Sequence, residues 1–214
     1  MSVTVKNSGT GEVTLSVDSD GMTTIASGEG GTSGADLTST SDVTLGGGGF
    51  SNSKLTNAKP TSSARKANPG AREVNIKTSF VKSDVVTKGN VTTDTLVKGG
   101  NVKGSKFNSK GGDDSIQFRG ASLKNTKVNL GKGADTVTFK NSEFAKRTTV
   151  DLGAQKNAKA DVVNINKPVE GGKIVIENFD EKDTLKLDGK KYSYDDLTSK
   201  PSPTLDNIKI KFDD

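Results

Sequence analysis

Five short segments, each an Asp followed after one residue by an aliphatic residue, recur along the chain at nearly constant intervals. They begin at Asp94, Asp114, Asp135, Asp161 and Asp183, so the intervals are 20, 21, 26 and 22 residues. A period near 21 is longer than a coiled-coil heptad and shorter than a helical-hairpin repeat. It is typical of a β-solenoid, in which each coil buries its apolar face only by stacking on the next coil.

The repeat is clearest where residues 102–118 align without a gap with residues 123–139. The alignment places Val102 over Leu123, and Phe144 follows at the same position in the next coil. Each coil contains about three short apolar tracts, separated by Gly or Asn. Equivalent residues of successive coils would lie about 4.8 Å apart in a parallel solenoid. The sequence therefore predicts columns of similar side chains in a narrow apolar interior.

The predicted fold class is all-β, a parallel β-solenoid of about 21 residues per coil and about five coils. Alternating short runs predict an N-terminal β-strand region over residues 1–45. Residues 46–72 are rich in Gly, Pro and Ser, which predicts a linker or extended arm. The solenoid is expected over residues 73–178. Residues 179–214 are expected to form a C-terminal cap, with a hairpin turn at Asp188-Gly189, that covers the open strand edges of the last coil.

The composition excludes several kinds of site. The chain has no Cys and no His, which removes disulfides, thiolate metal sites and the usual general base near neutral pH. Only 29% of residues are hydrophobic and 5% are aromatic, so stacking platforms for nucleic-acid bases or sugars are scarce. The N-terminus lacks the pattern of a secretory signal, and no apolar stretch is long enough to cross a membrane. No catalytic residues are predicted.

Charge is distributed unevenly along the chain. Residues 1–58 carry two Lys against six carboxylates, residues 59–178 carry 22 Lys or Arg against 11, and residues 179–214 carry seven against nine. The basic middle coincides with the repeats, so its Lys residues are expected on the outward half of alternating strands. This pattern fits either a solvated surface or a surface for an acidic partner. Nucleic acid is weakly supported as a partner, because Lys far outnumbers Arg.

The repeated Asp has two interpretations. Before a strand, its carboxylate could accept backbone N–H groups across a corner, and Gly112 and Gly133 would supply that corner. Alternatively, Asp114 and Asp135 could bind calcium. Residues 110–118 and 131–139 resemble the nonapeptide repeats of RTX proteins, and this resemblance implies calcium at those two Asp. Calcium requires six to eight oxygens, and one Asp per coil among many basic residues favours the structural role. No cofactor is predicted, with calcium the one candidate.

Residues 176–197 resemble the C-terminal cap that follows RTX repeats in bacterial and cyanobacterial proteins. Residues 131–139 are also similar to coils in structural proteins of marine tailed phages, especially those of cyanobacteria. The resemblance implies a non-enzymatic virion protein, either a head decoration or cement protein or a fibre-like appendage. Its expected partners are the major capsid protein or other virion proteins, in a homo-oligomer or multi-copy assembly located in the virion, with no membrane.

Three other functions remain open. The first is an exported RTX-type calcium-binding adhesin or surface-layer protein. The second is a polysaccharide-degrading β-helix enzyme, for which Asp113 and Asp114 are the one adjacent carboxylate pair of the repeat block. Neighbouring residues of a strand point to opposite faces, so this pair would not converge on a substrate. The third is a lattice-matching solenoid such as an ice-binding protein, although Thr does not recur in one register.

Overall fold

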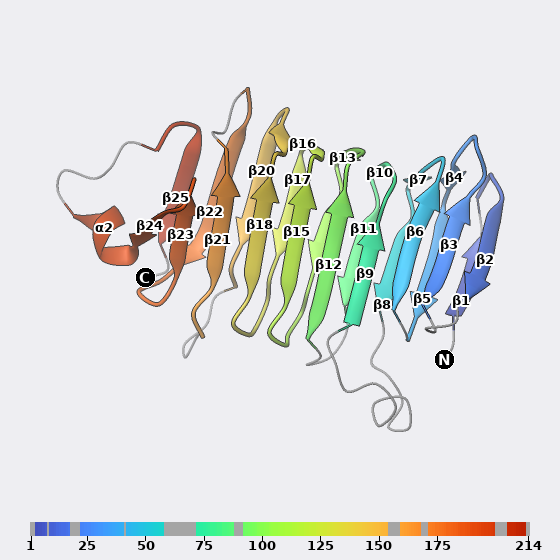
Figure 1. Cartoon of the computed structure of the whole chain (residues 1–214), viewed down its shortest axis with the longest axis horizontal. Coiled ribbons are helices and arrows are strands. Elements are labelled where there is room, and N and C mark those ends of the chain that lie inside the picture. Colours follow the sequence, from blue (N-terminus) through green and yellow to red (C-terminus); the bar gives the residue numbers. More distant parts are fainter. Residues whose placement is uncertain are drawn as a thin grey trace.

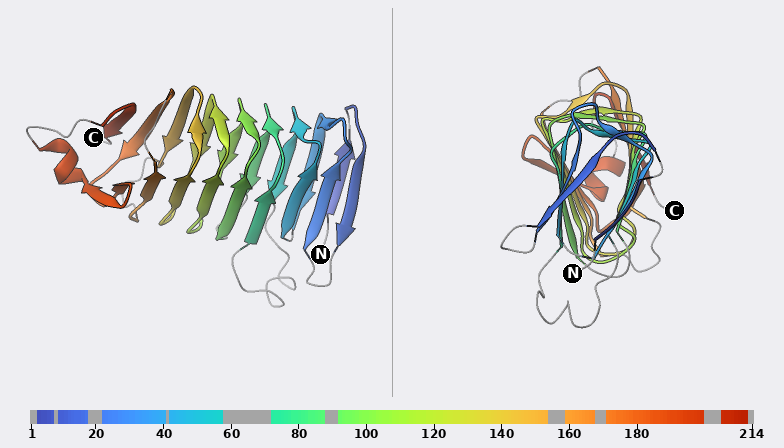
Figure 2. Two further views of the ribbon diagram at one scale, coloured as in Figure 1. Left: turned by 45° about the horizontal axis from the view of Figure 1, so that its top comes forward. Right: turned by 90° about the vertical axis from the view of Figure 1, so that its right-hand side faces the viewer.

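The protein is an elongated stack of β-coils (Figure 1). The computed structural model describes residues 3–7, 9–17, 22–40, 42–57, 72–87, 92–153, 159–167, 171–199 and 205–212. Three sheets run along the long axis and enclose a single core. The right panel of Figure 2 shows the stacked coils end-on. The predicted all-β parallel solenoid is confirmed. The shortest sheet has six strands, so the described chain makes six complete three-strand turns rather than about five.

The three sheets are named A, B and C here, with strands given in spatial order. Sheet A contains β1 (Val3–Asn7), β5 (Ala35–Ser39), β8 (Lys54–Asn57), β11 (Asp84–Thr87), β14 (Lys106–Asn108), β17 (Thr126–Asn129), β20 (Arg147–Asp151), β22 (Lys173–Phe179) and β25 (Ile208–Phe212). Sheet B contains β2 (Val13–Val17), β3 (Thr23–Ser27), β6 (Val43–Gly47), β9 (Arg72–Ile76), β12 (Thr93–Lys98), β15 (Ser115–Arg119), β18 (Thr136–Lys140), β21 (Val162–Asn166), β23 (Thr184–Leu187) and β24 (Lys190–Ser193). Sheet C contains β4 (Thr32–Ser33), β7 (Phe50–Ser51), β10 (Phe80–Val81), β13 (Asn101–Lys103), β16 (Ser122–Lys124) and β19 (Glu143–Phe144).

Each turn passes through sheet B, then sheet C, then sheet A, and the next turn pairs with it in parallel. The predicted register is correct where the alignment was clearest. Val102 pairs with Leu123, and Leu123 pairs with Phe144. All three side chains are buried, so the column of similar residues predicted from the 21-residue interval lies inside the stack.

The core is built from alternating inward residues of short strands. In β15 and β18 the buried residues alternate with partly exposed ones, which is the pattern of a sheet with one apolar face. Phe118 and Phe139 stack with ring centroids 5.3 Å apart and an interplanar angle of 7°. Phe107 and Phe144 contact this pair edge-on at 5.1 and 5.2 Å. Three successive turns are thus joined by one continuous row of four aromatic rings.

The solenoid begins well before residue 73, which corrects the expected boundary between arm and repeats. Strands β3 to β8, over residues 23–57, already pair in parallel within the three sheets. Phe50 and Leu55 are buried in the core, although they lie in the segment expected to be a linker. The reason is that Gly47 and Gly49 form a corner with positive φ rather than a flexible tether. The remainder of that segment, residues 58–71, lies outside the described residues.

Each end of the stack carries antiparallel pairs that are absent from its middle. At the N-terminal end, β1 pairs with β5 and β2 pairs with β3. At the C-terminal end, β23 and β24 form an antiparallel hairpin. Its two-residue turn is Asp188-Gly189, both with positive φ, as predicted. A short helix, α2 (Tyr194–Thr198), follows, and β25 then adds in parallel to β22. Within the predicted cap, residues 179–214, the described residues thus contain a hairpin, a short helix and a final strand of sheet A.

The corner between sheets C and A has one residue of positive φ in each of five turns. These residues are Gly34, Asn52, Lys82, Gly104 and Asn125. Gly and Asn tolerate this left-handed conformation better than other residues, so four of the five are suited to the corner. Lys82, with φ of 48°, is the exception.

Candidate functional site

The corner that enters sheet B contains a ladder of buried Asp side chains. The Oδ1 atom of each Asp accepts a hydrogen bond from the backbone N–H of the equivalent residue one turn earlier. The N–H groups of Thr93, Asp114, Asp135 and Asp161 donate in this way to Asp114, Asp135, Asp161 and Asp183, with N···O distances of 2.7, 2.7, 2.8 and 2.9 Å. We call these four side chains the Asp ladder. All four are at most 3% exposed.

Asp94 does not belong to the Asp ladder, although the sequence repeat includes it. The register pairs Asp94 with Ser115, so Thr93 occupies the position equivalent to Asp114. Thr93 is buried, whereas the Asp94 side chain is exposed. In this turn the Asp of the repeated pattern therefore lies one residue after the corner position, and Thr93 occupies the corner position itself.

Burial raises the pKa of three carboxyl groups in the Asp ladder. For Asp114 the pKa rises to about 8, first because the group is desolvated and then because the Asp135 carboxyl lies nearby. For Asp161 it also rises to about 8, from desolvation and the neighbouring carboxylates. For Asp135 desolvation raises the pKa to about 6, against the lowering effect of the Asp114 N–H. At neutral pH the column therefore holds protons that an exposed Asp would release.

The calcium interpretation of Asp114 and Asp135 stays a prediction. One carboxylate oxygen of each is engaged by the backbone, and the second, Oδ2, is buried without a hydrogen-bond partner. No group of three or more His, Cys, Asp or Glu side chains within the described ranges could hold a metal ion. Gly133 has φ of 145°, and a Cβ there would lie 1.8 Å from the Gly112 carbonyl oxygen, so the predicted glycine corner is closely packed backbone.

A second ladder, of buried Ser side chains, crosses the corner between sheets C and A. The backbone N–H groups of Ala35, Ser53 and Ser83 donate to the Oγ atoms of Ser53, Ser83 and Ser105, at 3.1, 3.0 and 3.3 Å. It satisfies corner N–H groups as the Asp ladder does, but with neutral acceptors. The sequence reasoning missed it, because the intervals of 30 and 22 residues are uneven. The available signal was a Ser directly after three of the left-handed corner residues, Asn52, Lys82 and Gly104.

The adjacent carboxylates Asp113 and Asp114 do not converge on one site. Asp114 points into the core, whereas Asp113 is exposed and binds Lys159 Nζ at 2.9 Å. The N–H of Ala134 donates to the same Asp113 oxygen, and this bond together with Lys159 lowers the pKa of Asp113. A pair of carboxyl groups that faces opposite sides cannot share a substrate as a glycosidase pair does.

The outer surface around sheet C is strongly basic. Residues 98–110 contain four basic side chains, and residues 119–132 contain four more. Neither segment contains a carboxylate. The register stacks them, because Lys98 pairs with Arg119, Lys103 with Lys124, and Lys106 with Lys127. Arg119 in turn pairs with Lys140. We define the basic surface as Lys98, Lys103, Lys106, Arg119, Lys124, Lys127 and Lys140.

Most cations of the basic surface lack an ionic partner. Within the described part of the chain, only Lys127 forms an ion pair, at 3.7 Å from Asp151. Glu143 borders the surface in register with Ser122. Asp84, which is half-buried, lies in register with Lys106. Asp114 and Asp135 are buried in the corner before sheet B. The Asp ladder thus lies at the corner before sheet B, and the cations lie around sheet C. Along the axis, the cations of successive turns are about 4.8 Å apart.

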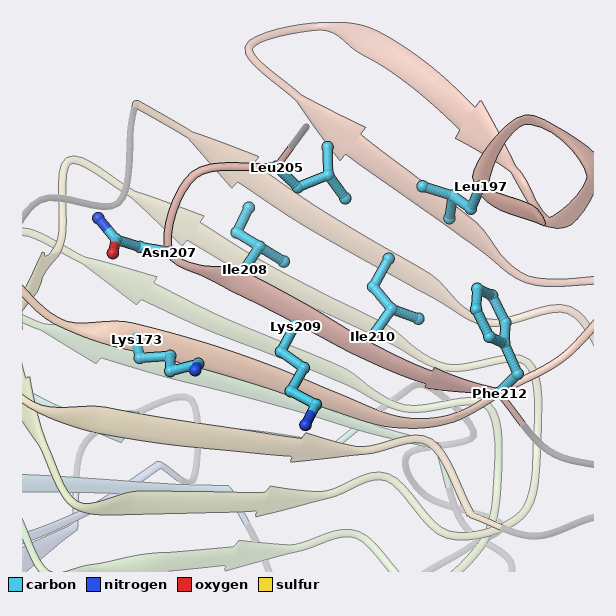
Figure 3. A pocket seen from close by; sticks show the side chains of 8 residues that line it. All are labelled: Lys173, Leu197, Leu205, Asn207, Ile208, Lys209, Ile210 and Phe212. Atoms are coloured by element: carbon cyan, nitrogen blue, oxygen red, sulfur yellow. The ribbon is translucent and has the colours of Figure 1, made fainter. Parts of the chain in front are cut away.

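A hollow of about 520 Å³ lies at the C-terminal end, beside the cap (Figure 3). Leu205, Ile208, Ile210 and Phe212 line it, and Lys173 and Lys209 border it. Ile210 pairs with Ile176, so the hollow is the place where the inward column of sheet A ends without another turn to cover it. Its lining contains no carboxylate, hydroxyl or thiol side chain.

Comparison of this chain with protein-family models, with curated proteins and with solved structures finds no match. The fold therefore defines the class of protein, a three-sided parallel β-solenoid, and the surface must supply any argument about function. Within the described ranges, no helix has both the length and the apolar character needed to span a membrane.

Proposed function

We propose that this chain is a non-enzymatic structural protein that acts by surface contact through its basic surface. The observation that carries the proposal is a stack of hydrogen-bonded turns that displays cations in register on one side, all but Lys127 without an ion pair among the described residues. Such an arrangement offers charge complementarity to an acidic partner and provides no acid, base or nucleophile pair for catalysis.

The setting we propose is the virion of a tailed phage, where the chain would be a head decoration protein or a fibre-like appendage. Its partners there would be the major capsid protein or other virion proteins. The argument for this setting is the resemblance of residues 131–139 to coils in phage structural proteins. The elongated solenoid is also suited to presenting a surface at a distance from an attachment point.

The test is a mass-spectrometric inventory of density-purified particles, before and after a wash in high salt. The proposal predicts a copy number per particle that reproduces between preparations. Partial release by salt would indicate an electrostatic attachment. A host protein of similar abundance serves as the control for adventitious carry-over. Recovery of the chain only in the free soluble fraction would rule the virion setting out.

The N-terminal edge of sheet B supports multi-copy assembly. Leu15 and Val17 of β2 are 46% and 65% exposed, and they are the large hydrophobic residues that the described chain leaves exposed. Both lie on the inward column, since Leu15 pairs with Ile25 and Val17 with Thr23. β2 carries neither charge nor Pro, the usual protection of an edge strand. A second copy of the chain that pairs with β2 would cover this end of the core.

The alternative function is an exported RTX-type calcium-binding adhesin or surface-layer protein. The observation in its favour is that Asp114 Oδ2 and Asp135 Oδ2 are buried without a hydrogen-bond partner. Thermal melting in millimolar calcium, with magnesium as the control, distinguishes the two functions. A calcium-specific rise in Tm would support the adhesin, because a ligand that binds only the folded state stabilises it. An unchanged Tm would remove the calcium argument.

A further inference from the structure

We infer that the basic surface binds an extended anionic polysaccharide whose chain runs along the solenoid axis. This inference rests on the proposed contact function and assigns the basic surface a ligand in addition to the virion proteins to which the chain would attach. The first argument is periodicity. Lys98, Arg119 and Lys140 occupy one outward column of sheet B in three successive turns. Lys103 and Lys124 continue the pattern in sheet C. A partner that uses all of them needs anionic groups repeated in a line, which a linear polyanion supplies along its whole length.

The second argument is that the cations are available. The solenoid keeps them at a spacing of about 4.8 Å along the axis, so they repel one another unless an anion lies between them. Lys98, Arg119 and Lys140 are exposed, and none of them has an ion-pair partner among the residues that the structure describes. A bound polyanion would relieve this repulsion and would release its own counterions, which makes such binding strongly dependent on salt.

The third argument separates a polysaccharide from nucleic acid. The basic surface contains six Lys and one Arg, whereas readout of base edges and bidentate phosphate contacts favour Arg. All its neighbouring Phe side chains are buried, so no ring is available for bases to stack on. Between the cations lie small polar side chains, such as Asn101, Ser122 and Gln117. Their amide and hydroxyl groups can donate to and accept from sugar hydroxyl groups.

The experiment measures binding of the full chain to a polygalacturonate oligomer, which carries one carboxylate per sugar, by isothermal titration calorimetry at two salt concentrations. Neutral dextran, a poly-glutamate peptide and a 20-base-pair DNA duplex are the comparison ligands. We expect polygalacturonate to bind more tightly than the other three, with an affinity that falls as salt is raised. Tighter binding of the peptide or the duplex would overturn the inference in favour of an acidic protein or nucleic acid. Equal binding of dextran would show that charge plays no part.

The decisive variant replaces one column, Lys98→Gln, Arg119→Gln and Lys140→Gln. The matched control removes the same number of charges elsewhere, Lys54→Gln, Lys186→Gln and Lys209→Gln. We expect the column variant to lose about tenfold or more in affinity and to show a shallower salt dependence, while the control stays within about twofold. Equal losses would mean that net charge alone attracts the polymer, and the inference would fail. Virions that contain the chain but show no polysaccharide binding would reject this inference and leave the proposed function intact.

Discussion

The backbone N–H of Asp114 donates to Oδ1 of Asp135 over 2.7 Å, although the two residues belong to successive turns. The same bond recurs between Asp135 and Asp161, at 2.8 Å, and between Asp161 and Asp183, at 2.9 Å. Each carboxyl group therefore replaces the strand hydrogen bond that a corner cannot make. The arrangement joins the turns, but it also places acidic groups in a row inside the protein, and this has consequences for stability.

The first prediction concerns pH. The pKa values of about 8 for Asp114 and Asp161 and about 6 for Asp135 lie above the ordinary value of 3.8. Between the ordinary pKa of 3.8 and the raised pKa of each group, the folded state holds protons that the unfolded state has released. The free energy of unfolding therefore falls as pH rises through this range. Because one pKa unit corresponds to about 1.4 kcal/mol, we expect the loss between pH 5 and pH 8.5 to be several kcal/mol, which appears as a clear fall in Tm.

Thermal melting followed by circular dichroism between pH 3 and pH 9 measures this dependence. At the acidic end, stability should also fall, because the lowered pKa values of Asp113, Glu177 and Asp196 indicate carboxylates that favour folding when ionised. Their contribution is present above their ordinary pKa and is lost as pH falls through the folded value. A Tm that rises from pH 5 to pH 8.5 would show that the ladder is not protonated as described.

The second prediction separates the two roles of Asp135. Asp135→Asn keeps an oxygen for the Asp114 N–H and removes the buried charge, so at pH 8 we expect unchanged or higher stability and a weaker pH dependence. Asp135→Ala leaves that N–H without an acceptor and should cost about 1–3 kcal/mol. Urea unfolding at pH 6 and pH 8 measures both variants. Equal destabilisation by Asn and Ala would contradict the acceptor role.

The third prediction tests the inward assignment. Val137 is fully buried between Ile116 and Val163 of the neighbouring turns. Val137→Asp should cost several kcal/mol or prevent folding, because an unpaired charge would enter the core. Val137→Ala gives a folded comparison with an expected cost of about 1–3 kcal/mol. Thr138→Asp, on the outward face of the same strand, should change Tm little. Similar melting of the two Asp variants would refute the assignment.

The fourth prediction is a stabilising substitution. Lys82 has φ of 48° at the corner where Asn52 and Gly104 occupy the equivalent positions. A left-handed conformation costs an ordinary residue roughly 1–2 kcal/mol, and Asn adopts it more readily. Lys82→Asn should therefore raise the free energy of unfolding by about 1 kcal/mol. Lys103→Asn, in an extended strand, is the control and should give no gain. A lower Tm for Lys82→Asn would contradict the corner geometry.

The fifth prediction concerns association through β2. Leu15→Lys with Val17→Lys places charge on an edge that exposes apolar side chains. We expect this variant to be monomeric under conditions in which the parent chain associates, as measured by light scattering after size-exclusion chromatography. Lys190→Gln with Lys191→Gln, on the opposite edge strand β24, is the control. An unchanged oligomer in the β2 variant would place the interface elsewhere on the molecule.

The sequence by itself determined the fold class and the register of the central turns. An insertion-free interval of 21 residues, with Val102, Leu123 and Phe144 in one column, is sufficient because side-chain alternation allows one register only. The hairpin at Asp188-Gly189 followed equally well from its turn residues, since few other residues adopt the required φ values.

Only the tertiary structure showed which residues share a corner, and that the segment before residue 58 forms turns of the solenoid. Thr93 rather than Asp94 enters the Asp ladder, because hydrogen-bond register, and not residue type, fixes the position. The glycine-rich segment before residue 58 forms full turns, because neighbouring coils supply the burial that its few apolar residues lack. The raised pKa values likewise depend on desolvation by stacked turns, a property that no local sequence pattern contains.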